Sequence, residues 1–87
     1  MYKRQELGRA LFERGDVEEA VRSLKRSVEL SEHPESGLYL AMALQASGHA
    51  DEALTWYRRA LDWISSSEDD YETLRTRAED ALGIAGE

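Results

Sequence analysis

The amino-acid sequence predicts an all-α fold of five antiparallel helices, and two features of its pattern support this prediction. The chain repeats itself, because Gly15 and Gly48 lie 33 residues apart and the same offset relates small residues to small ones and bulky apolar residues to bulky apolar ones. Apolar residues also recur every three or four positions, which is the spacing of one helix face. Pairs at the offset include Leu7 and Leu40, Leu11 and Leu44, and Ala20 and Ala53. The sequence therefore predicts two helical hairpins followed by a closing helix.

Length and composition limit the classes of function. The 87 residues suffice for one small domain, so we expect residues 1–87 to form a single unit. Cysteine is absent and only two histidines are present, which leaves no disulfide and no zinc site. The net charge of -7 has the wrong sign for binding phosphates, so we expect no nucleic-acid partner. No targeting segment and no run of about eighteen apolar residues is present, so we expect no membrane contact and a cytoplasmic location.

The first repeat, about residues 2–33, is predicted to be a helical hairpin. Its first helix ends at Gly15, since glycine readily adopts the left-handed conformation that terminates helices. Asp16 is a candidate N-cap for the second helix, and Glu19 three residues later matches a capping box. The apolar stripe of this second helix consists of Val17, Ala20, Val21, Leu24 and Val28.

The second repeat, about residues 34–66, follows the same plan. Pro34 suits the first turn of its first helix, Gly48 ends that helix, and the next helix starts near Ala50. One face of that second helix carries Ala53, Leu54, Tyr57, Ala60, Leu61 and Ile64, with Trp56 and Trp63 along its edge. Two roles remain open for the tryptophans. We favour packing of Trp63 against the closing helix, facing Tyr71 and Leu74, over anchoring of a partner.

The closing helix, about residues 68–84, is predicted from a polar segment followed by a narrow apolar stripe. Carboxylates at residues 68–70 suit the first turn of a helix, although the same acidic run could attract a basic partner or calcium. The stripe consists of Tyr71, Leu74, Ala78, Ala81 and Leu82. One apolar side and one polar side are what the last helix of a solenoid needs.

The two hairpins resemble the tetratricopeptide repeat. The residues that carry the resemblance are Leu7-Gly8, Leu11, Gly15-Asp16 and Glu19-Ala20 in the first copy, and Leu40-Ala41, Leu44, Gly48, Glu52-Ala53, Tyr57 and Ala60 in the second. Arg4 and Gly37 depart from the pattern, since they stand where the family usually has a large aromatic residue. The resemblance covers roughly residues 2–64. It implies a right-handed α-α superhelix whose first helices line a concave groove, and a function in binding a peptide segment of a protein partner.

Helical spacing locates the groove that this resemblance implies. Leu7, Gly8 and Leu11 are expected to face the core, so the opposite faces of the two first helices carry the candidate binding residues. We expect an apolar floor made of Phe12, Leu38 and Met42, and an Arg9 side chain that binds a carboxylate of the ligand. The candidate partner-binding residues are Gln5, Arg9, Phe12, Leu38, Met42 and Gln45.

Two other functional classes compete with peptide binding. The same face could be covered by the next repeat of a longer array or by a second copy of the chain, which would make the protein a structural or oligomerisation element. For an enzyme, the sequence offers no nucleophile elbow, no phosphate loop and no acid-base cluster, so we expect no catalytic residues, no cofactor and no metal. The lysine and asparagine clamp with which some family members hold chaperone tails is not evident, because Gln5, Arg9 and Tyr39 occupy the corresponding places.

Overall fold

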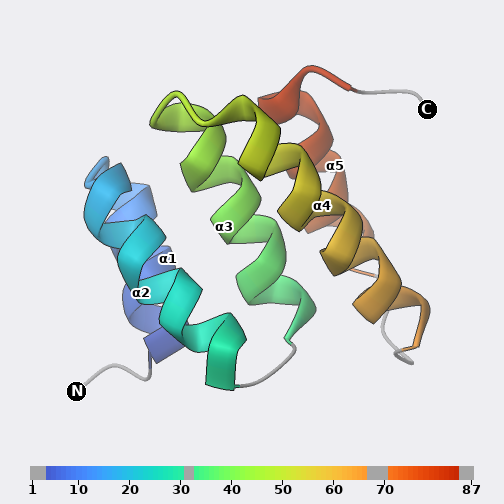
Figure 1. Cartoon of the computed structure of the whole chain (residues 1–87), viewed down its shortest axis with the longest axis horizontal. Helices are drawn as coiled ribbons and strands as arrows, with labels where there is room; N and C mark the ends of the chain where they lie inside the picture. The colour runs from blue at the N-terminus through green and yellow to red at the C-terminus, as the bar shows by residue number, and fades with distance from the viewer. Residues whose placement is uncertain (1–3, 31–32, 67–70, 85–87) are drawn as a thin grey trace.

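The described residues form five helices. A computed structural model of the chain describes residues 4–30, 33–66 and 71–84, and these ranges contain helices and turns but no strand. The helices are α1 (Arg4–Arg14), α2 (Val17–Leu30), α3 (Pro34–Ala46), α4 (Ala50–Ser65) and α5 (Glu72–Leu82) (Figure 1). The predicted all-α class and the predicted number of helices are confirmed. No helix of the described ranges is long and apolar enough to cross a bilayer.

Three of the helices end in the same way. Gly15, Gly48 and Gly83 follow α1, α3 and α5, and their φ angles are 93°, 89° and 74°. The amide of the residue after each glycine donates to the carbonyl five residues earlier, at 2.9, 2.8 and 3.0 Å respectively. This is the Schellman arrangement, in which a left-handed residue turns the chain sharply out of a helix. The predicted helix ends at Gly15 and Gly48 are thus confirmed, and α5 terminates like the first helix of each hairpin.

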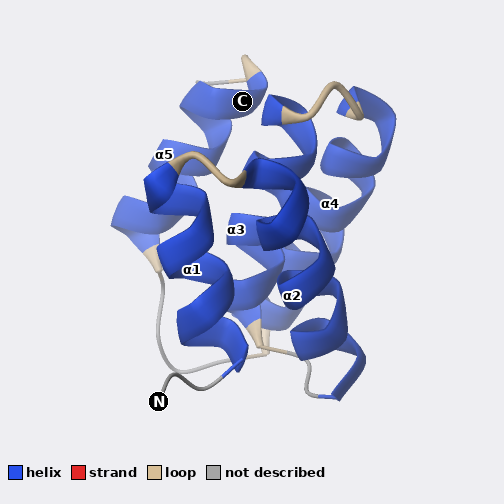
Figure 2. Cartoon of the chain, turned by 90° about the vertical axis from the view of Figure 1, so that its left-hand side faces the viewer, coloured by secondary structure: helices blue, strands red, loops and turns tan. Residues whose placement is uncertain are grey.

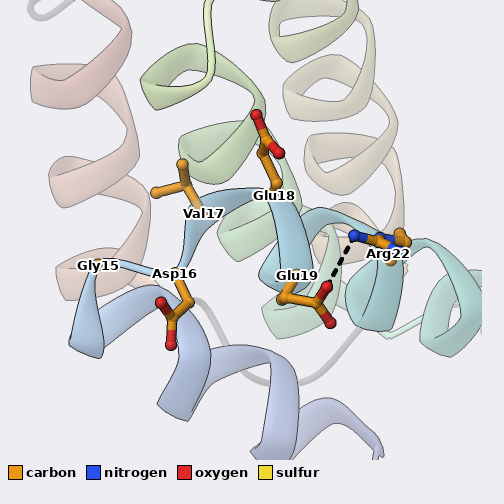
Figure 3. Close-up of a pocket in the computed structure, with 6 residues that line it drawn as sticks. All are labelled: Gly15, Asp16, Val17, Glu18, Glu19 and Arg22. Atoms are coloured by element: carbon orange, nitrogen blue, oxygen red, sulfur yellow. Dashed lines mark hydrogen bonds and ion pairs between the residues drawn. The ribbon is translucent and has the colours of Figure 1, made fainter.

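The predicted capping box at the start of α2 is not formed. The carboxylate of Asp16 pairs with Arg14 at 3.0 Å, and Glu19 pairs with Arg22 at 2.7 Å (Figure 3). The Asp16 amide, which a capping box would offer to Glu19, already donates to the Leu11 carbonyl, and the Asp16 carboxylate is held by Arg14. A cavity of about 330 Å³ beside this turn is lined by Gly15 and Val17 and by the charged side chains of Asp16, Glu18, Glu19 and Arg22.

Helix α3 occupies the centre of the molecule and contacts all four other helices (Figure 2). Different residues of α3 make these contacts. Ser36 bonds to Ser27 of α2 at 3.0 Å, Gly37 faces α4, and Tyr39 meets both α1 and α5. Residues 36–44 of this helix are all buried. A helix that is apolar on every side is stable in a small domain only when it is enclosed in this way.

Glycines allow two close contacts between helices. A Cβ on Gly8 would lie 2.5 Å from Cγ of Leu24, so α1 and α2 approach one another over the leucine side chain. A Cβ on Gly37 would lie 3.0 Å from the ring of Trp63. The Trp63 ring lies over Gly37, with its centroid 6.3 Å from that of Trp56. Packing of Trp63 against Tyr71 and Leu74 of the closing segment stays a prediction.

Helix α5 packs mainly on α3 and makes little contact with α4. The Tyr57 hydroxyl of α4 donates to the Glu79 carboxylate at 2.6 Å, and Arg77 reaches across to Glu13 of α1 at 3.2 Å. In Figure 2, α1 and α5 lie on one side of α3 while α2 and α4 lie on the other. The first helices therefore share a face, here called the inner face, and α5 is drawn toward it.

Candidate partner-binding surface

The six residues predicted to line the groove do not lie together. Arg9 is exposed and Phe12 is half-buried on the same side of α1. Gln5 belongs to α1, but its side chain lies outside the described residues. Leu38 is 0% exposed and Met42 is 2% exposed, so neither can contact a partner in this conformation. The predicted apolar floor is therefore wrong for these two residues.

The reason for this error is the position of α5. Helical periodicity puts Leu38 and Met42 on the side of α3 that points away from the α2 contact at Ser36 and from the α4 contact at Gly37. The other two neighbours of α3 are α1, which meets Tyr39, and α5, whose Ala78 is fully buried. Since α5 makes the larger contact of the two, it is the main cover for apolar side chains that the sequence pattern did not assign to the core.

Gln45 belongs to a different surface. It lies near the end of α3 and lines a cavity of about 210 Å³ together with Leu54, Leu82 and Ile84. This cavity involves α4 and α5, whereas Arg9 and Phe12 lie on α1. Consequently, Arg9 and Phe12 are the predicted residues that remain accessible on the inner face.

The structure adds three residues to this inner face, of which only Arg77 lies on a helix that the sequence prediction did not assign to the groove. Tyr39 packs edge-on against Phe12, with ring centroids 5.9 Å apart and planes at 65°. The Arg77 guanidinium lies 5.8 Å from the Tyr39 ring and donates to its hydroxyl at 3.4 Å. Arg77 also pairs with Glu13. We call Arg9, Phe12, Glu13, Tyr39 and Arg77 the inner strip.

The inner strip has a defined charge. A hydrogen bond to Glu13 raises the pKa of Arg77 above its ordinary value, so this side chain stays cationic. Arg9 makes no ion pair with any residue of the described ranges, so it presents an unneutralised guanidinium one turn before Glu13. An exposed cation beside the half-buried Phe12 ring can bind both an apolar side chain and a carboxylate. No sequence pattern signals the pairing of Arg77 with Glu13, because 64 residues separate them.

A second polar contact fixes α5 to α4. Burial raises the pKa of Tyr57 to about 12, and the hydrogen bond to Glu79 acts in the same direction. The phenol therefore remains a neutral donor at physiological pH, and Glu79 accepts its hydrogen bond.

The described residues contain no cluster of three or more histidine, cysteine, aspartate or glutamate side chains that could hold a metal ion. The acidic run at residues 68–70 lies outside the ranges that the structure describes.

Models of the tetratricopeptide repeat match the chain twice, at residues 4–33 and 34–59. The two matches adjoin one another, cover more than half of the chain and correspond to the hairpins α1–α2 and α3–α4. The chain belongs to the tetratricopeptide repeat family. Tetratricopeptide repeats are generally protein–protein interaction modules and non-enzymatic scaffolds. No curated protein and no solved structure matches the chain significantly.

One departure from the tetratricopeptide pattern has a structural explanation. Gly37 stands where a repeat usually has a large aromatic residue, and the Trp63 ring from α4 fills the space above it. The aromatic contact between the two helices of this repeat is thus supplied by its second helix. Arg59 stacks on the neighbouring Trp56, 4.9 Å from the ring centroid.

Proposed function

We propose that this tetratricopeptide repeat protein is an interaction scaffold that holds a segment of a protein partner along the inner strip. The observation that supports the proposal is the combination of the unpaired Arg9 guanidinium with the half-buried Phe12 ring on one side of α1. A partner segment would place an apolar side chain on Phe12 and a carboxylate on Arg9. The ion pair between Arg77 and Glu13 limits the strip on the α5 side.

A random-peptide display library tests the proposal even though the natural partner is unidentified. Peptides selected on the wild-type chain are measured against Phe12→Ala and Arg9→Glu by fluorescence anisotropy. The matched control is Arg26→Glu, which makes the same charge change at an exposed position of α2. We expect a loss of at least about tenfold in affinity for the two α1 variants and none for the control. Peptides that bind all four chains equally would refute the inner strip as the site.

We also propose that the chain acts without catalysis or cofactor, and in the cytoplasm. The family is generally non-enzymatic, and the absence of cysteine from the sequence fits a reducing compartment. Fractionation of cells that express the tagged protein tests the location. Recovery with a secreted or membrane fraction would contradict it.

A second function, an assembly element, is favoured by exposed leucines on the first hairpin. Leu7 was predicted to face the core, yet it is 39% exposed, whereas its repeat-two equivalent Leu40 is 0% exposed. Leu40 is enclosed because α2 packs beside α3, and no helix of the described part of the chain lies in the equivalent place beside α1. Leu30 is 67% exposed on the same hairpin. A further repeat or a second copy would cover such a surface.

Sedimentation equilibrium distinguishes this function from peptide binding. Assembly through the first hairpin predicts a concentration-dependent dimer of the wild-type chain that Leu30→Glu abolishes, since a buried carboxylate would lose its hydration. A monomer at every concentration would remove self-assembly as a function of this surface.

A further inference from the structure

The position of α5 leaves part of α4 uncovered. The 33-residue offset makes Leu61 of α4 equivalent to Val28 of α2. Val28 is buried because α3 packs closely on α2, whereas Leu61 stays half-buried because α5 packs on α3 and makes little contact with α4. The side chain at this position of the repeat is therefore buried in the first hairpin and partly exposed in the second.

This opening forms a furrow between α4 and α5. Three adjoining cavities of about 400, 390 and 210 Å³ share Ile84 in their walls. The furrow runs beside α4 from Ala50 to Leu61, roughly 16 Å at the rise of an α-helix. We call it the α4–α5 furrow and define it by Leu54, Tyr57, Arg58, Leu61, Leu82 and Ile84. Its length matches about three turns of a helix.

The charges in the furrow are unevenly distributed. In the middle cavity, Arg58 is the only charged side chain among the five lining residues, and it forms no ion pair with any residue that the structure describes. Arg75 lines the adjoining cavity, and its buried Nε has no hydrogen-bond acceptor because the nearest Glu79 oxygen is 3.9 Å away. The Glu79 carboxylate already accepts the Tyr57 hydroxyl. Arg58 in the middle cavity therefore has no carboxylate partner, and Arg75 in the end cavity is only partly neutralised by Glu79, which lines the same cavity.

From this charge pattern we infer that the α4–α5 furrow is a second docking surface, which receives an acidic amphipathic helix of a protein partner. Leucine-like side chains of that helix pack between Leu54, Leu61 and Ile84. A carboxylate on its flank pairs with Arg58, and Arg75 can turn to a second one. At the opposite end, Asp51 lines the cavity and disfavours a further carboxylate. The charges therefore also set the direction of the bound helix.

This surface is independent of the inner strip. The furrow is built from α4 and α5, whereas the accessible residues of the strip are on α1 with Arg77 on another side of α5. Failure of one site leaves the other unaffected, so the two proposals can be tested separately on one protein.

The test uses the full chain and two synthetic helical peptides with capped ends. Both carry leucines at i and i+4, and one has glutamates while the other has lysines on the flanking positions. Binding is measured by fluorescence anisotropy, and the site is mapped by amide chemical shifts in NMR spectra. The protein variants are Arg58→Glu, Ile84→Ser and the control Arg26→Glu on α2.

We expect the glutamate peptide to bind the wild-type chain and to shift the amides of the furrow residues. Arg58→Glu should lower the affinity for this peptide by at least about tenfold, and this variant should bind the lysine peptide more tightly than the wild-type chain does. Ile84→Ser should weaken both peptides, and circular dichroism should show that the variant remains helical. Arg26→Glu should leave binding unchanged.

Several results would overturn the inference. These are no binding of the glutamate peptide, equal binding to wild type and Arg58→Glu, shifts confined to the inner strip, or no effect of Ile84→Ser in a folded protein. A concentration-dependent dimer that Arg58→Glu abolishes would identify a second copy of the chain as the occupant, and would also overturn it.

Discussion

Replacement of Gly8 by alanine should destabilise the protein, although alanine is the better helix former. The added Cβ would lie 2.5 Å from Cγ and 2.6 Å from Cδ2 of Leu24, against an ordinary carbon–carbon contact of about 3.5–4.0 Å. Leu24 is fully buried and its branch point cannot move aside without moving α2. The change therefore forces α1 and α2 apart.

The size of the effect follows from two opposing contributions. Overpacking of a buried contact costs about 1–3 kcal/mol, and an overlap of about 1 Å on a branched carbon puts Gly8→Ala near the upper end. The gain in helix propensity is about 1 kcal/mol. We expect a net loss of about 2 kcal/mol in the free energy of unfolding, measured by urea titration followed by far-ultraviolet circular dichroism with an unchanged m-value.

Gly37→Ala is the matched control for Gly8→Ala. Its Cβ would lie 3.0 Å from the half-buried Trp63 ring, which can shift, and 3.0 Å from the Cβ of Ala60, which is fixed to α4. The overlap is about half of that at Gly8, so an overpacking cost of about 1–2 kcal/mol is largely offset by the propensity gain, and we expect a net loss of less than about 1 kcal/mol. In addition, Leu24→Ala should lower the free energy of unfolding by about 2–5 kcal/mol in the wild type. In the Gly8→Ala variant the loss should be about 2 kcal/mol smaller, because removal of the leucine side chain also removes its overlap with the added Cβ. Equal stabilities of Gly8→Ala and Gly37→Ala, or additive effects at Gly8 and Leu24, would refute the reasoning.

Three further changes test other contacts. Tyr57→Phe should cost about 1.5–3 kcal/mol because it removes a hydrogen bond to a carboxylate. Because the folded-state pKa is raised from 10.0 to about 12, the contribution of Tyr57 is complete below pH 10 and is lost as the pH rises toward 12. A pH series of unfolding curves should show this loss, by about 1.4 kcal/mol per unit, in the wild type and not in Tyr57→Phe. Arg77→Ala should lower the free energy of unfolding by only about 1 kcal/mol, because the ion pair with Glu13 is exposed. It should nevertheless speed amide hydrogen exchange in α5, because this pair joins α5 to α1. Unchanged exchange would contradict the role of Arg77. Ser27→Ala should lower the free energy of unfolding in urea by about 1–3 kcal/mol, because it leaves the buried Ser36 hydroxyl unpaired. The double variant with alanine at both Ser27 and Ser36 should be about as stable as the wild type. A double variant that is less stable than Ser27→Ala would contradict this account.

The sequence predicts those features that depend on local pattern. Gly15 and Gly48 end their helices as expected because a left-handed residue after an apolar stripe is a local requirement. The capping box at Asp16 is also a local prediction, but it fails because the Asp16 amide donates to the Leu11 carbonyl that ends α1 and because Arg14 pairs with the Asp16 carboxylate. The signal for the end of α1 and the signal for the start of α2 use the same residue there, and the sequence pattern does not show which of them prevails.

The candidate site is harder to predict because it depends on where α5 lies. Periodicity identifies Leu38 and Met42 as apolar but does not say which helix covers them. That helix is fixed by the contact of Tyr57 with Glu79 and by the contact of Arg77 with Glu13, which join residues 22 and 64 positions apart. The signal in the sequence is an α3 that is apolar on all sides. Such a pattern fits a binding face as well as a central helix, and the structure shows the central helix.

The central place of α3 also has a consequence for unfolding. In long repeat arrays each unit touches only its neighbours, so the ends fray and melt stepwise. Here α1, α2, α4 and α5 all rest on one helix. Detachment of any of them exposes apolar side chains of α3 to water and weakens the packing of the remaining three helices on it. The molecule should consequently melt in a single cooperative transition, with equal calorimetric and van't Hoff enthalpies.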